Sequence, residues 1–450
     1  MIPTQPDRRW KRIPHARLQL DSSAASSSHD LPHSTPQYLW AEDEKMKRYL
    51  VVFVLFILVM ITHIDRVCIS ASKEFIGGQL HLSDAAMGII FSAWALGYAL
   101  NQIPGGWLID KVGPRAGLTV VVGLWSVMAI LTGFAWSFTS LLVVRFSLGM
   151  AEAGVFLGSA RAICNWLPPG ERGRANGVLF SGSRISAAIS LPLLAWMLAR
   201  WPWRNSFLML GAIGALWTVI WLVWFRDWPA KPLPKIAAAT PANGGLLRIL
   251  RSWPMVFNMF QYFAGNFTFF LCMSWMLPYL KREYRLGDSQ AATYAMIPLL
   301  VAATAQWSAG WLVDRLYHSQ FRAWSRRLPA MLGFTLAAVG MVALTRATAP
   351  GLAVFYLSVS VFGAEMTLSP SWVFCADIAG ENTARVSGTM NMAGNIGSFV
   401  CANAFPYLQR VTGSASAYFL IAAAFNAIAV LCWYYMRSID EQKATIAAAN

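Results

Sequence analysis

The chain has 450 residues, of which 56% are hydrophobic and only 13% charged, and its mean hydropathy is +0.47. This composition excludes an ordinary soluble domain, in which about 25% of residues are charged. The net charge of +15 does not indicate nucleic-acid binding, because Lys and Arg gather in the N-terminal tail and in alternate connections between apolar segments. The composition indicates a polytopic membrane protein.

Residues 1–45 differ sharply from the rest of the chain. They are polar and rich in Ser, Pro and Arg, and they contain no apolar stretch that would serve as a signal peptide. This composition predicts a disordered, basic N-terminal tail. The stretch MKRYLVV begins at Met46, directly before the first apolar segment, so the sequence leaves open whether translation starts at Met1 or at Met46.

Twelve apolar segments follow the tail and fill nearly the whole chain. A membrane-spanning helix needs roughly 20 mostly apolar residues. The segments are centred near residues 58, 96, 125, 152, 187, 214, 267, 301, 336, 361, 397 and 426. They predict an all-α membrane protein with twelve transmembrane helices, since no strand pattern or soluble domain competes with them.

The basic connections predict the orientation of the chain in the membrane. Lys and Arg gather at 111–115, 171–174, 226–251 and 314–327, with 281–285 as an exception. By the positive-inside rule, the N-terminus, the central linker and the C-terminus are cytoplasmic. The six cysteines lie in or at the ends of apolar segments without a His partner at metal spacing, so we expect no metal site and no cofactor.

The chain repeats a short motif at an offset of 204 residues. Gly106, Trp107, Leu108 and Asp110 recur as Gly310, Trp311, Leu312 and Asp314. Each copy lies between the second and third helix of a six-helix half. Two parallel halves predict a pseudo-two-fold axis along the membrane normal and a cavity between two bundles. We expect these bundles at 46–226 and 253–438, a cytoplasmic linker at 227–252 and a C-terminal tail at 439–450.

The repeated loop resembles the signature loop of the major facilitator superfamily. The resemblance implies a gating motif formed by Gly106, Leu108, Asp110, Lys111, Gly113 and Arg115, and by Gly310, Asp314 and Arg315 in the second copy. Glycine lets two helices approach closely, and the aspartate can meet a helix N-terminus or a basic residue across the gate. The second copy lacks the later glycine and basic residue, so we expect its latch to be weaker. A tight charged turn without a gating role is the alternative.

Several charges interrupt the apolar segments, and each costs roughly 2.5 to 3.5 kcal/mol at a helix centre. They are Asp65, Arg66, Arg145, Glu152, Arg184 and Glu365. The first two end the first apolar run. Arg145 and Glu152 are seven residues apart, about two helical turns, so they face the same side of their helix. Helices one and four of such a bundle both line the cavity, so we expect one cluster of four charges. A salt bridge that serves folding alone is the alternative.

A second resemblance, to the anion:cation symporter family, narrows this prediction. Its motifs D-R-x-x-(I/L)-S, R-F-x-x-G-x-A-E-A and W-(F/L)-P-x-x-E-R-G are here Asp65, Arg66, Ser70, Arg145, Phe146, Gly149, Ala151, Glu152, Ala153, Trp166, Leu167, Pro168, Glu171, Arg172 and Gly173. Members of this family move organic anions such as galactonate, glucarate and hexuronates, and many bacterial members couple uptake to protons. The resemblance implies that Arg66 or Arg145 binds the substrate carboxylate and that Asp65 and Glu152 carry protons.

Further substrate-binding candidates lie on other helices. Tyr98 resembles a family tyrosine whose hydroxyl contacts substrate. Asn391 and Asn395 lie one turn apart on one helix face, a spacing that suits sugar hydroxyls. Ser371 and Trp372 would line the wall of the C-terminal half. For Tyr98, Ser371 and Trp372 the alternative is a packing role.

Arg184 is a departure from the family pattern, because many sugar-acid members have a glutamine there. An added arginine facing the cavity favours a second negative charge or a larger acidic group on the substrate, and Glu365 would offset it. Snorkelling of Arg184 toward an interface is the alternative. We expect His63 and Arg161 to be structural.

These features together predict a secondary transporter that imports a small carboxylate by proton symport and alternating access. An anion exchanger and a transporter-like membrane sensor are the alternatives. We find no catalytic constellation and expect no enzymatic activity. We expect a monomer in the bacterial inner membrane whose partners are the substrate, protons and lipid, not nucleic acid. The sequence leaves the identity of the anion and the proton stoichiometry open.

Overall fold

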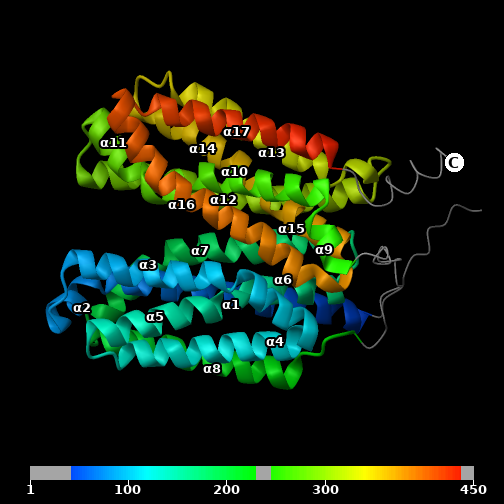
Figure 1. Cartoon of the computed structure of the whole chain (residues 1–450), viewed down its shortest axis with the longest axis horizontal. Helices are drawn as coiled ribbons and strands as arrows, with labels where there is room; N and C mark the ends of the chain where they lie inside the picture. Colours follow the sequence, from blue (N-terminus) through cyan, green and yellow to red (C-terminus); the bar gives the residue numbers. More distant parts are fainter. Residues whose placement is uncertain (1–41, 230–244, 437–450) are drawn as a thin grey trace, which may run out of the picture. The chain divides into compact units, whose positions relative to one another are not determined.

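The computed structural model describes residues 42–229 and 245–436, and every regular element in these two ranges is a helix (Figure 1). The first range contains α1 (Glu42–Ala71), α2 (Lys73–Leu80), α3 (Asp84–Leu100), α4 (Gln102–Gly133), α5 (Phe138–Glu152), α6 (Gly154–Trp166), α7 (Arg172–Leu198) and α8 (Trp203–Trp224). The second contains α9 (Gly245–Leu250), α10 (Trp253–Ser274), α11 (Met276–Tyr284), α12 (Asp288–Tyr317), η1 (Arg322–Trp324), α13 (Arg327–Leu344), α14 (Pro350–Met366), α15 (Leu368–Ala379), η2 (Gly380–Asn382), α16 (Thr383–Thr412) and α17 (Ser416–Tyr435).

The centre of each of the twelve predicted spans falls on a helix. By length and hydropathy, eight stretches of the described residues qualify as membrane spans, and two bent helix pairs raise the number to ten. One of the eight, Pro350–Thr412, contains two helical passes, because α14 and α15 are followed by a short turn and by α16. The predicted span centred near residue 267 falls on α10, which is 22 residues long but is not among these stretches. The prediction of an all-α, multi-span membrane protein is therefore confirmed.

The predicted boundaries differ from the helix bounds at three places. α1 begins at Glu42, before the predicted start at residue 46, and it continues past Asp65 and Arg66 to Ala71. These two charges therefore lie inside the first helix and not at the end of a span. α9 occupies part of the predicted linker. Most of the predicted N-terminal tail, linker and C-terminal tail lies outside the described residues.

α4 contains a sharp kink at Gly113, where the backbone takes φ +84° and is followed by Pro114. Positive φ values favour glycine, and proline cannot continue the hydrogen bonding of the preceding turn. The kink separates Gln102–Val112, which extends the second predicted span, from Pro114–Gly133, which is the third. The repeated motif therefore lies at the turn between two spans.

The described residues belong to one compact unit that is built from two halves. Figure 1 shows α1–α8 together in the lower part of the view and α10–α17 in the upper part. The halves meet where α4 and α6 pack against α16, and where α7 packs against α12 and α15. The candidate site lies among the helices of the first half and at this contact between the halves.

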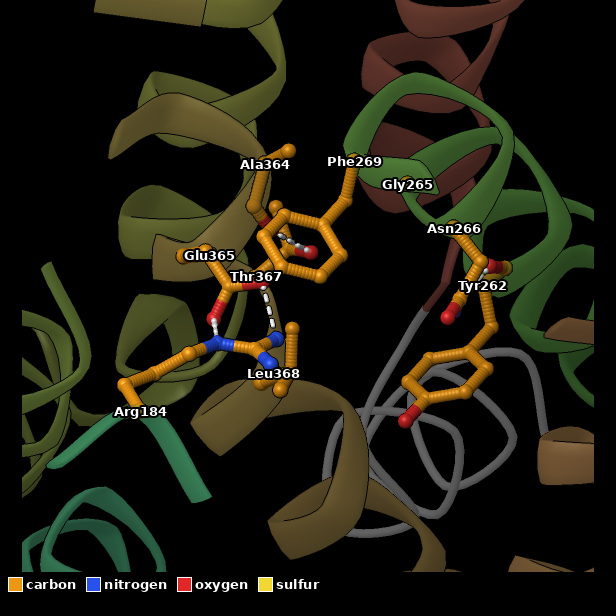
Figure 2. Close-up of a pocket in the computed structure, with 9 residues that line it drawn as sticks. All are labelled: Arg184, Tyr262, Gly265, Asn266, Phe269, Ala364, Glu365, Thr367 and Leu368. Atoms are coloured by element: carbon orange, nitrogen blue, oxygen red, sulfur yellow. Dashed lines mark hydrogen bonds and ion pairs between the residues drawn. The ribbon is translucent and has the colours of Figure 1, made fainter. Parts of the chain in front are cut away.

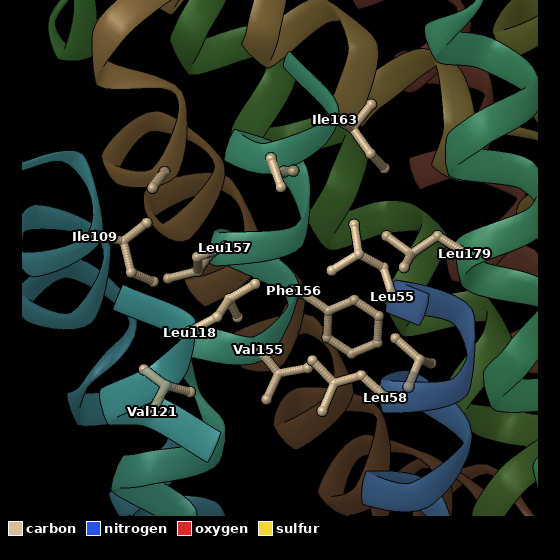
Figure 3. Close-up of a cluster of buried hydrophobic side chains, with 14 of the residues drawn as sticks. Leu55, Leu58, Ile109, Leu118, Val121, Val155, Phe156, Leu157, Ile163 and Leu179 are labelled. Carbon is tan, nitrogen blue, oxygen red and sulfur yellow. The ribbon is translucent and has the colours of Figure 1, made fainter. Parts of the chain in front are cut away.

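Apolar side chains fill the interior of the first half and also cover the outside. Figure 3 shows part of the interior, with Leu55 and Leu58 of α1 close to Phe156 of α6 and Leu179 of α7. Many large apolar side chains point outward as well, including Val223, which is 78% exposed. An apolar outer surface is expected where the surrounding solvent is lipid.

We name the two ends of the helical unit by what lies there. The linker end holds α9, the start of α7 and the kink of α4, at the right of Figure 1, and the distal end holds α2 and α11, at the left. Neither short distal helix was predicted from the sequence.

Candidate functional site

Four charged side chains from α1 and α5 form two ion pairs in the interior of the first half. Arg66 Nε lies 2.6 Å from Glu152 Oε1, and Arg145 Nη1 lies 3.3 Å from Asp65 Oδ2. The structure thus brings together the four residues that the sequence places in one cluster. Asp65, Arg145 and Glu152 are at most 2% exposed, whereas Arg66 is 25% exposed. A solute entering this region therefore reaches Arg66 first.

Two aromatic rings hold the guanidinium group of Arg66 in place. Its Cζ lies 4.6 Å from the ring centre of Trp94 and 5.0 Å from that of Tyr98, both on α3. Trp94 Nε1 also donates to Glu152 Oε2 at 2.8 Å. A cation seated on aromatic faces is stabilised without losing its hydrogen-bonding edge. Sequence reasoning missed Trp94, although it precedes Tyr98 by one helical turn and so shares its face.

The predicted residues of α16 connect to the same region. Asn391 Nδ2 donates to Gln102 Oε1 at 3.0 Å and lies 3.4 Å from the Tyr98 hydroxyl, which links the two halves. Asn395 Nδ2 donates to the backbone oxygen of Asn391 at 2.9 Å. Both asparagines are partly exposed.

Ser371 and Trp372 are buried in this conformation. The Ser371 hydroxyl donates to the backbone oxygen of Thr367 at 2.6 Å and accepts from Gln261 Nε2 at 3.0 Å. Trp372 Nε1 donates to the Tyr262 hydroxyl at 2.9 Å. Ser371 therefore packs inside the second half here, whereas Trp372 reaches the boundary between the halves.

Trp372 belongs to an aromatic layer, which we define as Phe156, Phe180, Tyr262 and Trp372. Ring centres of Phe156 and Phe180 lie 6.1 and 5.2 Å from that of Trp372, so rings from α6 and α7 meet a ring from α15. Phe156 follows Glu152 by four residues in the direction of the linker end. The aromatic layer therefore separates the charged cluster from the linker end.

A third ion pair joins the halves on the distal side of the aromatic layer. Arg184 Nη2 of α7 lies 2.7 Å from Glu365 Oε1 of α14, and Arg184 Nε donates to Oε2 at 3.3 Å (Figure 2). Gln306 of α12 also donates to Glu365. The arginine that departs from the family pattern thus meets the acid that the sequence assigned as its offset, rather than snorkelling to an interface.

His63 lies between these two charged regions. Its Nδ1 is 3.1 Å from the backbone oxygen of Val59, and its ring meets the Phe156 ring edge-on at 6.1 Å. His63 precedes Arg66 by three residues, so Phe156 of the aromatic layer lies about one helical turn from Arg66 along α1.

At the linker end, each aspartate of the repeated motif caps a helix of the opposite half. Asp110 accepts hydrogen bonds from the backbone N–H groups of Ala384 and Arg385 at 3.0 and 2.9 Å, at the start of α16. Asp314 accepts from Gly173 and Arg174 at 2.8 and 2.8 Å, at the start of α7. A carboxylate at a helix N-terminus satisfies free N–H groups and interacts favourably with the helix dipole.

The second latch makes the same two backbone hydrogen bonds as the first, so the expected weakness is not visible in its contacts. The reason is that the bonds require only the aspartate and a helix start. The later motif residues of the first copy act within their own half: Arg115 Nη2 donates to the Leu222 backbone oxygen at 2.7 Å, and Asp227 accepts from the Arg115 backbone N–H at 2.7 Å. Lys111 and Arg315 stack on Trp107 and Trp311 of their own helices.

Close glycine contacts bring the capped helices together. A Cβ on Gly106 would lie 2.7 Å from the Ala384 backbone oxygen, and one on Gly310 would lie 2.6 Å from that of Gly173. Further along, a Cβ on Gly388 or Gly177 would lie 2.5 Å from the backbone oxygen of a glutamine in the opposite half. No larger residue fits these crossings without moving the backbone.

The sequence predicted a helix N-terminus or a basic residue as the partner of each aspartate, and both are present: Arg385 Nε lies 3.6 Å from Asp110 and Arg174 Nε 3.8 Å from Asp314. Sequence reasoning did not name the two helices, although a second repeat marks them. Arg174 and Gly177 recur as Arg385 and Gly388 at an offset of 211 residues. Arg161, expected to be structural, donates through Nη1 to the Gly380 backbone oxygen at 2.6 Å and so also bridges the halves. Within the two described ranges, no group of three or more His, Cys, Asp or Glu side chains is arranged to hold a metal ion.

Known proteins resemble this chain over most of its length. It is 33% identical over 411 residues to the probable sulfoacetate transporter of Cupriavidus necator, which covers 87% of the chain and 94% of that relative. It is 29% identical over 430 residues to the probable galactarate/D-glucarate transporter of Escherichia coli, covering 88% of the chain and 96% of the relative. These relatives confirm the resemblance to bacterial organic-anion transporters that the sequence motifs indicate.

The fold has a counterpart among solved structures. The proton:xylose symporter XylE matches 89% of this chain and 99% of its own with a TM-score of 0.73, at 13% sequence identity. The family model described as Major Facilitator Superfamily matches residues 55–402. A transporter of this kind moves its substrate without chemical change, so the chain is not an enzyme. The chain is a multi-pass integral membrane protein that belongs to the Major Facilitator Superfamily.

Proposed function

We propose that this protein imports a small organic anion together with protons by alternating access. The observation that supports the proposal is the environment of Arg66. Its guanidinium is partly exposed and lies against two stacked aromatic rings, whereas its ion-pair partner, Glu152, is fully buried. An arginine offers two parallel N–H donors to a carboxylate and stays charged at any physiological pH. A substrate carboxylate is therefore a matched replacement for Glu152 on Arg66.

Proton coupling follows because the substrate displaces Glu152 from Arg66. When the substrate takes its place on Arg66, Glu152 remains in a buried position without its cation, and a buried unpaired charge is costly. A proton on Glu152 removes that charge. Asp65 is the second acid of the mechanism, and it responds after Glu152 because its partner, Arg145, is only 2% exposed.

Access to this site is controlled at the linker end. The two aspartate latches and the aromatic layer close that end. When one bundle rocks against the other, the linker end opens and the distal end closes. The basic connections that favour a cytoplasmic location lie at the linker end. The described conformation is then the one that receives substrate from outside, and the membrane is the bacterial inner membrane.

The substrates named for two relatives support this class of anion. Sulfoacetate, galactarate and D-glucarate are all small organic anions that carry a carboxylate. Each offers the group that Arg66 would bind, and the sugar acids add hydroxyls that Asn391 and Asn395 would contact.

Uptake into proteoliposomes tests the proposal. Labelled sulfoacetate, galactarate, galactonate and an aromatic acid are offered with and without an inward proton gradient, to the wild type and to Glu152→Gln. We expect gradient-driven accumulation of at least one anion by the wild type. For galactonate, which carries one carboxylate, Glu152→Gln should lose accumulation but keep counterflow of labelled against unlabelled substrate. Glu74→Gln, which changes an exposed glutamate of α2, is the matched control.

Other outcomes point to the alternatives. Accumulation that depends on an anion inside the vesicle and not on the proton gradient would replace symport by anion exchange. Binding of an anion without any uptake or counterflow would favour a membrane sensor. Equal behaviour of wild type and Glu152→Gln in a gradient would remove Glu152 from the mechanism.

A further inference from the structure

The ion pair between Arg184 and Glu365 has an unusual location for a structural salt bridge. It joins the two halves of the molecule, and its acid receives N–H donors from two helices, α7 and α12. Burying a salt bridge is a weak way to stabilise a fold, because the cost of desolvation offsets most of the attraction. Stabilising the fold is therefore a weak explanation for this ion pair, and its surroundings indicate another role.

The pair lines a small pocket of about 30 Å³ between the halves. Tyr262, Asn266 and Thr367 add polar groups to the same lining, and Figure 2 shows these side chains around the ion pair. Arg184 is 15% exposed, whereas Glu365 is 1% exposed. The pocket therefore presents the cation of the pair, with hydrogen-bonding groups beside it.

The environment of Arg184 resembles that of Arg66. Arg184 Cζ lies 4.0 Å from the ring centre of Phe269, as Arg66 Cζ lies 4.6 Å from that of Trp94. Each guanidinium thus has an aromatic ring on its face, a buried glutamate on its edge and some exposed surface. A side chain in this arrangement is preorganised to exchange one carboxylate for another.

The two arginines lie on the same side of the aromatic layer. His63, three residues before Arg66 on α1, meets the Phe156 ring edge-on at 6.1 Å, and Phe180, four residues before Arg184 on α7, lies 5.3 Å from the same ring. Each arginine therefore follows, by about one helical turn toward the distal end, a ring that packs against Phe156.

We propose that Arg184 is a second anion subsite, so that this transporter selects substrates with two anionic groups over substrates with one. The inference rests on the proposed function and deepens it. One carboxylate of the substrate replaces Glu152 on Arg66, and a second carboxylate or a sulfonate replaces Glu365 on Arg184. Both arginines belong to the first half, so a substrate that displaces Glu365 of α14 breaks this ion pair between the halves.

Charge balance sets the proton stoichiometry of such a substrate. Both ion pairs are neutral before binding, so a dianion leaves two buried glutamates without their cations. The groups that face Glu365 are Arg184 of α7, Gln306 of α12 and Tyr262 and Cys272 of α10. With Arg184 engaged by substrate, none of the others supplies a positive charge. One proton on each glutamate restores neutrality, which gives two protons per dianion and one per monoanion.

The test uses probe pairs that differ in one anionic group. Galactarate is compared with galactonate, which has a hydroxymethyl in place of the second carboxylate, and sulfoacetate is compared with glycolate. The kcat/KM of each is measured in proteoliposomes for the wild type, Arg184→Gln and Arg184→Lys. Arg200→Gln, which changes an exposed arginine just beyond α7, is the control. Size-exclusion profiles and thermal unfolding of the purified variants report whether each folds.

We expect the wild type to prefer the dianion in at least one pair. In Arg184→Gln the ratio of kcat/KM for dianion over monoanion should fall about 10-fold or more, since a charge-assisted two-point contact contributes on that order. Arg184→Lys should restore part of the ratio because it restores the charge. An equal fall for both probes, or an unchanged ratio, overturns the second subsite.

Glu365→Gln gives an independent readout that does not require Arg184 to change. With the proton site removed, dianion uptake should carry net charge and respond to a potassium diffusion potential, whereas wild-type uptake should not. Dianion uptake that stays independent of the potential overturns the two-proton assignment. Failure of the proposed function is distinguishable, because then neither member of any probe pair would accumulate in a proton gradient, whatever residue stands at 184.

Discussion

The charged cluster of α1 and α5 and the two latches at the linker end use ionised side chains in opposite ways. In the cluster, Arg66 and Glu152 meet side chain to side chain within one half. In the latches, Asp110 and Asp314 meet backbone N–H groups across the two halves. Contacts within one half survive a rocking motion of the halves, whereas contacts between halves must break. The comparison therefore supports our proposal that the cluster binds substrate and that the latches control the conformation.

The largest expected effect breaks the binding side of this comparison. Arg66→Gln removes the cation that we propose as the carboxylate-binding group and leaves Glu152 buried without its ion-pair partner. Loss of one partner of a buried charged pair costs a few kcal/mol, so we expect substrate affinity to fall on the order of 100-fold. Titration of the purified variant with galactarate and sulfoacetate measures this. Unchanged affinity for an anion that the wild type transports would contradict the assignment.

A larger side chain at a glycine where two helices cross tests the proposed closure of the linker end. Gly388→Val places a side chain where even a Cβ would lie 2.5 Å from the Gln102 backbone oxygen. The linker end should then fail to close, and uptake should fall about 10-fold or more, since overpacking a close contact costs typically 1 to 3 kcal/mol. Anion binding should persist in the purified variant, because Arg66 lies in another part of the interior.

The matched control for this change is Gly88→Val on α3, where a Cβ would meet no atom within 4 Å. Equal loss of uptake in both variants would indicate a general cost of adding valine and would remove the argument for a specific crossing. Loss of anion binding in Gly388→Val would show that the crossing also shapes the site.

Removing one latch charge should have a smaller effect, of a few-fold. Asp110→Asn and Asp314→Asn keep a side chain of the same size at each helix start but lose a charge that contributes about 0.3 to 1 kcal/mol there. Cys164 is a native reporter, because it is partly exposed at the linker end and lies 3.7 Å from Thr383 of the other half. Its rate of thiol alkylation should rise in both variants, and more in Asp110→Asn/Asp314→Asn together.

The remaining described cysteines are buried, and Cys164→Ser identifies any labelling that comes from them. Similar increases for the two single variants are expected because the two latches make the same backbone hydrogen bonds. A rise in only one of them would show that the latches differ in strength, as the incomplete second motif suggests from sequence alone.

The smallest expected effect is that of removing the basic residues of the repeated motif, which should exclude them from the latches. Lys111 and Arg315 belong to the repeated motif, yet their charges lie 4.9 and 5.4 Å from the ring centres of tryptophans on their own helices. Exposed contacts of this kind contribute about 0.5 to 1 kcal/mol. Lys111→Gln and Arg315→Gln should therefore change uptake by about two-fold or less. A loss as large as that of Gly388→Val would mean that these charges act across the halves.

The sequence was sufficient where physics makes a residue conspicuous. Charges inside apolar helices are costly, so Asp65, Arg66, Arg145 and Glu152 stood out, and the helical period placed two of them on one face. A long apolar run likewise predicts a membrane-spanning helix. These signals need no knowledge of how the halves meet.

The sequence was insufficient where backbone groups or the meeting of the halves decide the contact. Asp110 and Asp314 accept hydrogen bonds from backbone N–H groups at helix starts, and the only side chains that mark these starts are the repeated Arg385 and Arg174, which lie 3.6 and 3.8 Å from the aspartates. Arg161 reaches a backbone oxygen of the other half for the same reason. Trp94 was missed because an apolar helix is rich in aromatics, and its role depends on where Arg66 points.

The central claim is that substrate binding to Arg66 transfers the need for a proton to Glu152. Calorimetric titration of galactonate, galactarate and sulfoacetate into the purified protein, repeated in buffers of different ionisation enthalpy, counts the protons taken up on binding. The account predicts net proton uptake for whichever anion binds the wild type, and one proton fewer in Glu152→Gln, which still binds. The same number of protons in both proteins would contradict it.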